Sequence, residues 1–221
     1  MRQLGWFGAE PLGSVLAIGA HSDDLEIGCG GTLLTLTRAW PGVHVHWLVL
    51  AAHGSRVEEA QSSAEAFLSH VSNPTIEVLS FRDGYLPHES SGVKDVFEGL
   101  KPRIDPELVL THTRGDLHQD HRLVCELTWN TFRDHLILEY EIPKYDGDLG
   151  RPDAFVALSE EIVEEKLTLL ERHFSTQRSK DWFDGDVFRG LMRLRGMECR
   201  SPSGYAEAFT ARKVLYSLLP G

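Results

Sequence analysis

The chain has 221 residues, of which 42% are hydrophobic and 25% charged, and its formal net charge is −11. This length suits one domain with one core, and the composition shows neither extreme that marks a disordered chain. The negative charge and the scattered Lys and Arg side chains exclude nucleic acid as the expected partner. No apolar run approaches the roughly 18 residues of a membrane span, so we expect a single soluble domain over residues 1–221.

The three cysteines are far apart in the sequence, odd in number and never in CxxC spacing. This pattern argues against a disulfide framework or a thiolate zinc site. The apolar stretch 15–20 near the N-terminus is too short for the core of a secretion signal. We therefore expect a cytoplasmic protein without a cleaved leader.

Short aliphatic and β-branched runs alternate along the chain with longer segments of helical periodicity. The predicted strands, in chain order, cover 15–19, 43–50, 76–79 and 108–111, and the later segments 136–145 and 155–158 also look extended. The predicted helices cover 28–40, 60–71, 93–100, about 116–132, and a segment after a Ser159 N-cap whose apolar face runs from 163 to 174. The alternation predicts an α/β fold with a mostly parallel sheet covered by helices. After Ser175 the signal weakens.

Two clusters of polar side chains follow predicted strands. The first is the run Ala20-His21-Ser22-Asp23-Asp24-Leu25-Glu26, and the second is His118-Gln119-Asp120-His121. Ligand crevices of open α/β sheets form at the carboxyl ends of the strands, where both clusters fall. Imidazole and carboxylate groups are ordinary zinc ligands, and a catalytic zinc site uses three of them and keeps a position for water.

Within these clusters, His21 and Asp24 supply two ligands from one tight turn. His118 and His121 share a face if a helix begins there, so one can bind metal while the other faces substrate. Adjacent side chains diverge, so Asp23 points away from the ligand position of Asp24, as a general base beside the metal would. A bound metal lowers the pKa of water to about 7 and polarises a carbonyl, so these parts together predict amide or ester hydrolysis.

The residues also match a family pattern. AHSDDLE resembles the AHPDDE signature of the LmbE-like family of zinc-dependent de-N-acetylases, also called the PIG-L family, and HQDH resembles its downstream HxDH motif. The resemblance implies a Rossmann-like single domain with helices on both faces of the sheet. It also implies removal of acetyl or related acyl groups from N-acetylglucosamine-type sugars, as in mycothiol, bacillithiol, glycolipid and natural-product pathways. Ser22 stands where the family usually has Pro, a departure that removes no ligand.

Carried over by position, the resemblance makes His21, Asp24 and His121 the zinc ligands and Asp23 the base. His118 would stabilise the oxyanion or help to protonate the leaving amine, with Asp120 tuning the charge of His118. The match extends to Arg56, which with Glu59 resembles the family's RxxEA segment, and to Asp83; both are assigned to substrate hydroxyls.

Several residues have simpler interpretations. In the simpler interpretation, Arg56 does no more than pair with Glu59 on a solvated helix face, and Asp83 does no more than shape a turn. The glycines from 28 to 31 fail the dinucleotide-binding pattern, so close helix packing explains them better. His112 ends the fourth predicted strand near the proposed site. The Trp182-Phe183 pair belongs either to the core or to the wall of a sugar pocket.

These observations predict a metal-dependent N-deacetylase, an amide hydrolase acting on linear C–N bonds. Its cofactor is Zn²⁺ or another divalent metal, and its partner is a small N-acylated sugar or sugar conjugate; an oligomer remains open. One alternative keeps the metal but acts on an acylated natural-product intermediate. Another is a binding module that recognises a sugar or nucleotide on the same fold without turnover.

Overall fold

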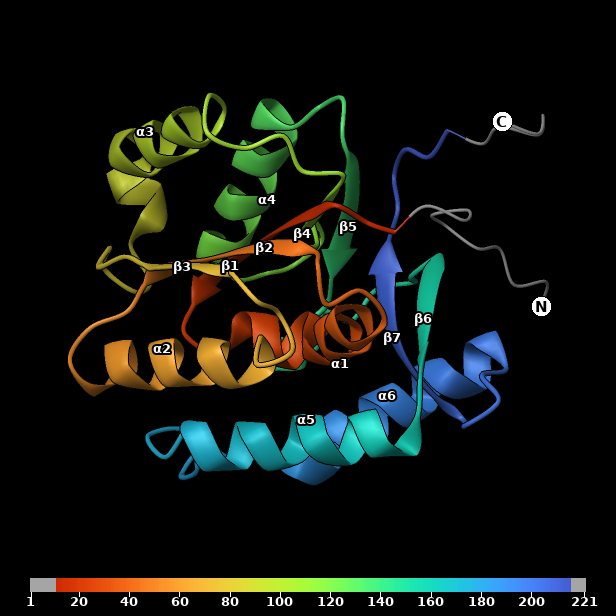
Figure 1. Ribbon diagram of the computed structural model, residues 1–221. Coiled ribbons are helices and arrows are strands. Elements are labelled where there is room, and N and C mark those ends of the chain that lie inside the picture. The colour runs from red at the N-terminus through yellow and green to blue at the C-terminus, as the bar shows by residue number, and fades with distance from the viewer. Residues whose placement is uncertain (1–10, 216–221) are drawn as a thin grey trace.

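The computed structural model describes residues 11–215, in which a seven-stranded sheet lies between layers of helices (Figure 1). The elements in chain order are β1 Ser14–His21, α1 Asp24–Ala39, β2 His44–Ala51, α2 Ser55–Phe67, β3 Thr75–Val78, the short 3₁₀ helix η1 Leu86–Glu89, α3 Ser90–Leu100, β4 Leu108–His112, α4 Gln119–Thr131, β5 Leu136–Tyr140, β6 Ala154–Leu158, α5 Glu160–His173, α6 Gly185–Cys199 and β7 Tyr205–Thr210. The expectation of no cleaved leader concerns residues 1–10, which lie outside this range.

The strand order is β3-β2-β1-β4-β5-β7-β6. The pairs from β3 to β5 are parallel, and β7 runs antiparallel to both of its neighbours. The chain leaves β1 for β2 on one side and reaches β4 on the other side of β1. This reversal of direction opens a crevice at the carboxyl ends of β1 and β4. The predicted mostly parallel α/β fold is confirmed.

Helices cover both faces of the sheet and enclose two apolar clusters (Figure 1). On one face α1 and α2 pack against the strands, with buried Trp47 and Phe67 between them, and α5 lies outside α1 and α2. On the other face α3 and α4 cover the strands through buried Phe97 and Phe132. Within residues 11–215, no helix combines the length and apolarity that crossing a membrane requires.

Glycines in α1 allow this helix to lie close to the strands beside it. A Cβ on Gly28 would lie 2.2 Å from Cδ2 of Tyr140, and one on Gly31 would lie 2.7 Å from Cδ1 of Leu158. A Cβ atom cannot lie this close to another carbon without displacing it, so only glycine fits at these two positions. Close packing, the interpretation preferred for the glycine run, agrees with this geometry.

Several element boundaries differ from those predicted. Helix α1 begins at Asp24 rather than at 28, because two carboxylates suit the first turn of a helix. The strand predicted over 136–145 ends at Tyr140. Ser159 caps α5 as predicted, since its Oγ accepts the N–H of Ile162 at 3.2 Å. Helix α6 and strand β7 were not predicted.

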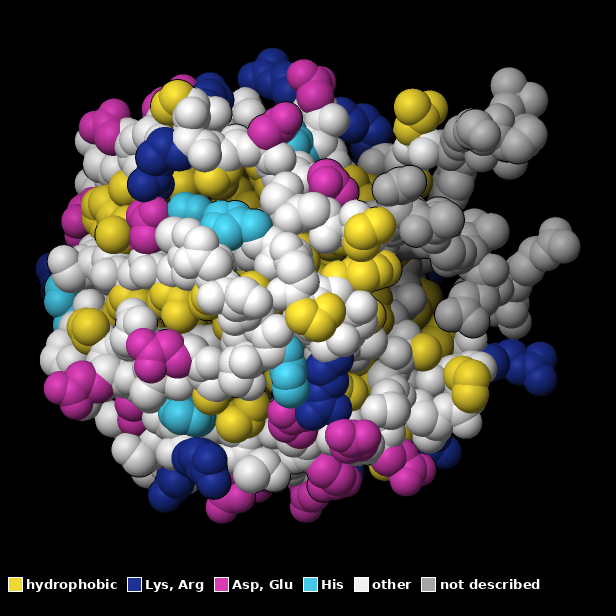
Figure 2. Space-filling view, viewed as in Figure 1, with side chains coloured by type: hydrophobic (Ala, Val, Ile, Leu, Met, Phe, Trp, Pro, Cys, Tyr) yellow, Lys and Arg dark blue, Asp and Glu magenta, His cyan; other side chains and the backbone are white. Residues whose placement is uncertain are grey.

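The surface seen in Figure 2 carries acidic and basic side chains of the described residues interspersed rather than gathered into patches of one sign. All three cysteines lie within residues 11–215 and are free thiols, and two of them, Cys29 and Cys125, are buried. The expectation of no disulfide framework is therefore met by the described part of the chain.

Candidate metal centre

Both predicted clusters meet at the carboxyl ends of β1 and β4. His21 is the last residue of β1, and α1 begins three residues later at Asp24. The turn is closed by the N–H of His21, which donates to Asp24 Oδ2 at 2.7 Å. The backbone of His21 therefore fixes the side chain of Asp24, a residue that is 4% exposed.

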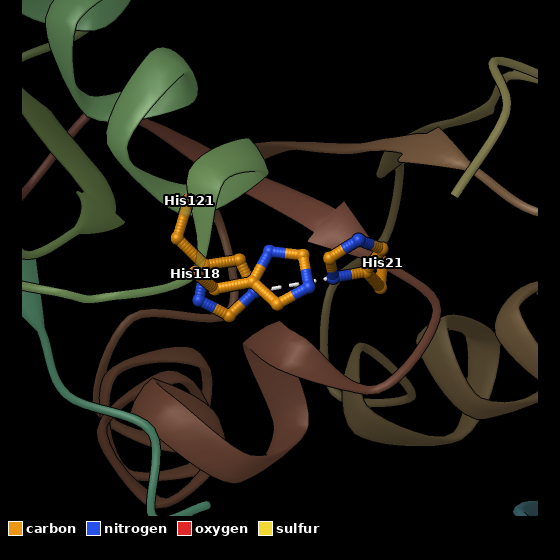
Figure 3. A group of neighbouring side chains, drawn as sticks. All are labelled: His21, His118 and His121. Atoms are coloured by element: carbon orange, nitrogen blue, oxygen red, sulfur yellow. Dashed lines mark hydrogen bonds between the residues drawn. The ribbon is translucent and has the colours of Figure 1, made fainter. Parts of the chain in front are cut away.

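Helix α4 brings in the second cluster. His118 is its N-cap and accepts the N–H of Asp120 on Nδ1 at 3.2 Å. His121 follows in the first turn, so both imidazoles leave the same end of the helix and face His21 across the crevice (Figure 3). The ring centroid of His21 lies 4.8 Å from that of His118 and 5.1 Å from that of His121.

The three predicted metal ligands converge. His21 Nδ1 lies 3.1 Å from His121 Nε2 and 3.4 Å from Asp24 Oδ2, and His121 Nε2 lies 3.5 Å from Asp24 Oδ1. Ligand atoms about 2.0–2.1 Å from a tetrahedral zinc ion are about 3.4 Å apart. The spacings are close to this value, with Asp24 offering Oδ2 to His21 and Oδ1 to His121.

Carboxylates on the far side of each ring strengthen this fit. His21 Nε2 lies 3.0 Å from Asp120 Oδ2, and His121 Nδ1 lies 2.9 Å from Asp116 Oδ2. When each ring donates an N–H to its carboxylate, the other two nitrogens face each other across 3.1 Å and are placed to share a cation. Carboxylate–histidine pairs of this kind commonly orient metal ligands.

The imidazoles and carboxylates of this cluster shift one another's pKa values. Burial lowers the pKa of His21, but the carboxylates of Asp24 and Asp120 outweigh burial and raise it well above its usual value. Burial, helped by the charge of His112, lowers the pKa of His121 to about 4. Burial alone would raise the pKa of Asp24, yet the neighbouring imidazoles hold it well below its usual value. The cluster thus keeps an ionised carboxylate facing the imidazole nitrogens.

Asp23 points to the side of this cluster, toward α2. Its Oδ1 accepts from Arg56 Nη2 at 2.8 Å, whereas its Oδ2 is buried with no hydrogen-bond partner among the described residues. Burial raises the pKa of Asp23, although Arg56 opposes the rise. One oxygen is therefore anchored, and the other is free to take a proton.

Arg56 is not simply paired with Glu59 on a solvated face, because its closest carboxylate is that of Asp23; Glu59 lies 3.9 Å away. Asp83 lies 3.2 Å from His21 Nε2 with 75% of its side chain exposed. The hydrogen bond to His21 lowers the pKa of Asp83 to about 2. Both residues line a cleft of about 220 Å³ that contains the side chains of the three predicted ligands.

Asp120 has a different neighbour from the one expected. Its carboxylate accepts the N–H groups of Gly84 and Leu86, at 2.8 and 3.1 Å, and meets the ring of His21 rather than that of His118. The carboxylate of Asp120 acts on His118 through its charge: burial lowers the pKa of His118, and the charge of Asp120 opposes that shift, while the backbone N–H of Asp120 donates to His118 Nδ1. The backbone at 84–86 holds the carboxylate in place, a tertiary contact that sequence spacing cannot reveal.

Sequence reasoning missed Asp116 and Lys144 as members of the site. Asp116 orients His121, and Lys144 Nζ lies 3.0 Å from Asp116 Oδ2 and 2.6 Å from Asp148 Oδ2. His112, noted only for its position, stacks on His121 with ring centroids 3.9 Å apart, and its Nε2 lies 3.1 Å from Asp24 Oδ2. For Asp116 the available signal was a carboxylate five residues before a predicted ligand.

Within residues 11–215, three overlapping groups of side chains have ligand atoms close enough to share an ion. They are His21 with His118 and His121, Asp24 with His112 and His121, and His21 with Asp83 and Asp120. All three groups contain His21 or His121. The cluster is therefore one centre with several available donors, rather than separate sites.

Comparison with known proteins agrees with this centre. The family model described as PIG-L, GlcNAc-PI de-N-acetylase, matches residues 16–132. The "uncharacterized deacetylase YaiS" of Escherichia coli K12 is 31% identical over 175 residues, which are 73% of this chain and 90% of that protein. The chain belongs to the PIG-L family. The resemblance drawn from the AHSDDLE and HQDH motifs is confirmed.

Solved structures share the PIG-L fold. A hydratase, GalB, the 4-carboxy-2-hydroxymuconate hydratase from Pseudomonas putida KT2440, aligns with a TM-score of 0.74 and 17% identity over 95% of this chain and 100% of that one. The N,N′-diacetylchitobiose deacetylase from Pyrococcus horikoshii aligns with a TM-score of 0.65 and 22% identity over 90% of this chain and 83% of that one. Because a hydratase and a deacetylase share this architecture, the fold alone does not select the reaction.

Proposed function

We propose that this protein is a metal-dependent N-deacetylase, with Zn²⁺ as the expected ion, that removes an acetyl group from an N-acetylglucosamine-type sugar or conjugate. The observation that carries the proposal is the convergence of His21, Asp24 and His121 at 3.1–3.5 Å, beside a carboxylate with one free oxygen. Family membership supports the deacetylase chemistry. In this proposal these three residues hold the ion, which would supply Lewis acidity and a water of lowered pKa.

Asp23 is the proposed general base. Arg56 fixes Oδ1 at 2.8 Å, and the unpartnered Oδ2 is the atom that accepts the proton of the attacking water. A carboxylate in a dry setting binds a proton more readily than one in water, which matches it to this task. The proton can later pass to the leaving nitrogen, so that water and amide are converted into acetate and a free amine.

His118 is the proposed electrophilic partner. Its Nδ1 accepts the N–H of Asp120, so the neutral ring carries its proton on Nε2. The ring lines the cleft together with Asp23. A donor there stabilises the negative charge that develops on the amide oxygen, or protonates the leaving amine.

Arg56 and Asp83 are the proposed contacts for sugar hydroxyls. Asp83 stands at the cleft mouth with an exposed, ionised carboxylate that can accept hydrogen bonds. Arg56 already holds Asp23, so a hydroxyl bound to its other nitrogens would place the substrate directly beside the base. A cleft of about 220 Å³ suits a small molecule, and the free thiols suit the cytoplasm.

The test uses Asp23→Asn. We expect the zinc content to stay at the parent level while acetate release from N-acetylglucosamine conjugates falls about 10²–10⁴-fold, because the variant keeps the shape and loses the proton acceptor. Asp95→Asn, an exposed position on α3, is the matched control and should match the parent in both measurements. Undiminished acetate release by Asp23→Asn would remove Asp23 as the base.

A companion assay separates the alternatives. Acetate release from N-acylated natural products but not from sugar conjugates would move the substrate to that class. A parent protein that binds zinc and sugar yet releases no acetate would be a binding module.

A further inference from the structure

The segment 174–184, which connects α5 to α6, forms part of the cleft wall. Gln177, Lys180 and Trp182 from this segment line the cleft that also contains the proposed metal ligands. At its far end Phe183 is buried and packs against Phe174 and Phe188, with ring centroids 6.0 and 5.3 Å away. The core therefore fixes one end of the segment.

Glu59 of α2 fixes the other end. Its buried carboxylate accepts three hydrogen bonds, from Ser175 Oγ at 3.0 Å, Thr176 N at 2.9 Å and Thr176 Oγ1 at 2.7 Å. Glu59 lies one turn after Arg56, which holds the proposed base. The first two turns of α2 thus anchor both the base and the cleft wall.

The carboxylate of Glu59 also sets the direction of the next hydrogen bond. An ionised carboxylate only accepts, so Thr176 Oγ1 must give its one proton to Glu59. Thr176 Oγ1 can then only accept from Gln177, whose amide lies 2.9 Å away. The NH₂ group of Gln177 therefore faces Thr176. No hydrogen bond joins its carbonyl oxygen Oε1 to another side chain or backbone group within residues 11–215, and the side chain lines the cleft, where Oε1 is available to a ligand.

We infer that Gln177 is a specificity-determining residue whose Oε1 accepts a hydrogen bond from a hydroxyl of the substrate, and that Glu59 and Thr176 are positioning residues that hold its amide in this orientation. The inference rests on the proposed deacetylase function and deepens it. A fixed acceptor selects a polyhydroxylated amine portion, because an apolar amide of similar shape would leave Oε1 buried without a partner.

The first experiment measures steady-state kinetics of the zinc-loaded full chain with N-acetylglucosamine and with N-acetylcyclohexylamine, which lacks the hydroxyls. We expect Gln177→Leu to raise KM for the sugar about tenfold and to leave the apolar amide within about twofold of the parent. Equal effects on both substrates, or none on either, would overturn the role of Gln177.

The second experiment tests the positioning residues. Thr176→Val keeps the shape and removes both hydrogen bonds, so KM for the sugar should rise about tenfold with kcat within about threefold of the parent; Thr176→Ser should restore KM. Glu59→Gln should act like Thr176→Val, because a neutral amide no longer dictates the direction of the hydrogen bonds from Gln177 through Thr176 to residue 59, which we call the relay. Its matched control is Glu58→Gln, an exposed neighbour on the same helix. Parent-like KM for Thr176→Val, or a loss of zinc and thermal stability together with kcat, would show a merely structural contact and overturn the relay.

A readout without substrate separates this inference from the proposed function. The ¹⁵N-labelled side-chain NH₂ of Gln177 should give a shifted, exchange-protected NMR signal in the parent that moves to the solvent-exposed position in Thr176→Val. If the parent shows this signal but releases no acetate, the relay stands and the deacetylase proposal fails. If acetate is released but the signal is absent, the relay fails alone.

Discussion

The two parts of the chain contribute differently to the cleft. The part up to the end of α4 supplies all the proposed ligands, the base and His118, gathered at the ends of two neighbouring strands. The part after α4 supplies no proposed ligand, but its side chains, including Lys144, Gln177 and Trp182, line the same cleft. In the proposed function, short motifs of the first part carry the reaction chemistry, and Arg56 and Asp83 of that part bind substrate together with residues that packing brings in from the later part.

Buried polar contacts join the two parts close to the site. Lys144 meets Asp116, and the carboxylate of Glu59 holds the segment that begins at Ser175. Each contact lies close to the proposed site in the sequence. Asp116 is two residues before His118, and Ser175 is two residues before Gln177. The comparison therefore predicts distinct outcomes for changes in each part and at the contacts between them.

The largest effect is expected from His121→Ala. Removing an imidazole from the ligand set should cost the bound zinc and lower acetate release about a thousandfold or more, because metal activation is worth several kcal/mol of the barrier. Zinc per chain by atomic emission and acetate release are the measurements. His88→Ala, an exposed histidine on η1, is the control. Full zinc content in His121→Ala would place the ion elsewhere in the cluster, for example on His21 with Asp83 and Asp120.

A smaller effect is expected where the two parts meet beside the metal. Asp116→Asn keeps the shape but weakens the hydrogen bond that orients His121, so zinc affinity should fall about 10–100-fold. Lys144→Met acts one step further away and should lower zinc affinity only a few-fold. Competition with a chromophoric chelator measures both. Unchanged affinity in Asp116→Asn would mean that the ring of His121 is held by packing alone.

The sequence predicts the first part of the molecule well because its signals are local. Strand 15–19 is a continuous apolar run in a buried position, and the motif at 20–26 directly follows it, so fold and ligands are read from the same few residues. The carboxyl ends of parallel strands then bring His21 and His121 together without further information. His21, Asp24 and His121 lie as expected, and their roles as ligands await measurement.

The later part resists prediction because its order comes from partners far away in the chain. Strand β7 contains Glu207, a buried charge that breaks the apolar pattern of an inner strand, and its neighbours in the sheet are β5 and β6. Helix α6 exposes Val187, Leu194 and Met197, which obscures its apolar face. The position of Gln177 depends on Glu59, more than a hundred residues earlier in the chain. No local pattern carries that information.

The smallest effect on turnover, yet a large one on stability, is expected from Lys166→Met. Lys166 is 1% exposed, and its Nζ donates to Ile27 O and to Glu207 Oε1, both at 2.7 Å. Glu207 in turn accepts the N–H groups of Gly31 and Thr32, so the pair binds α5 and β7 to the middle of α1. Removing one member leaves the other charge buried without its counterion, which should lower the free energy of unfolding by about 3–5 kcal/mol.

Urea denaturation measures this change, with Lys101→Met as the control, because its exposed pair with Glu98 is screened by solvent and should contribute little to stability. Folded Lys166→Met should keep its zinc and its KM, since the ion pair lies near the middle of α1 and Asp24 is held at the first turn by the N–H of His21. If stability and zinc affinity fall together, the position of Asp24 depends on the whole of α1, and the two parts of the chain share one cooperative site. If stability falls alone, the ligand turn is set locally, as the short spacing of its motif implies.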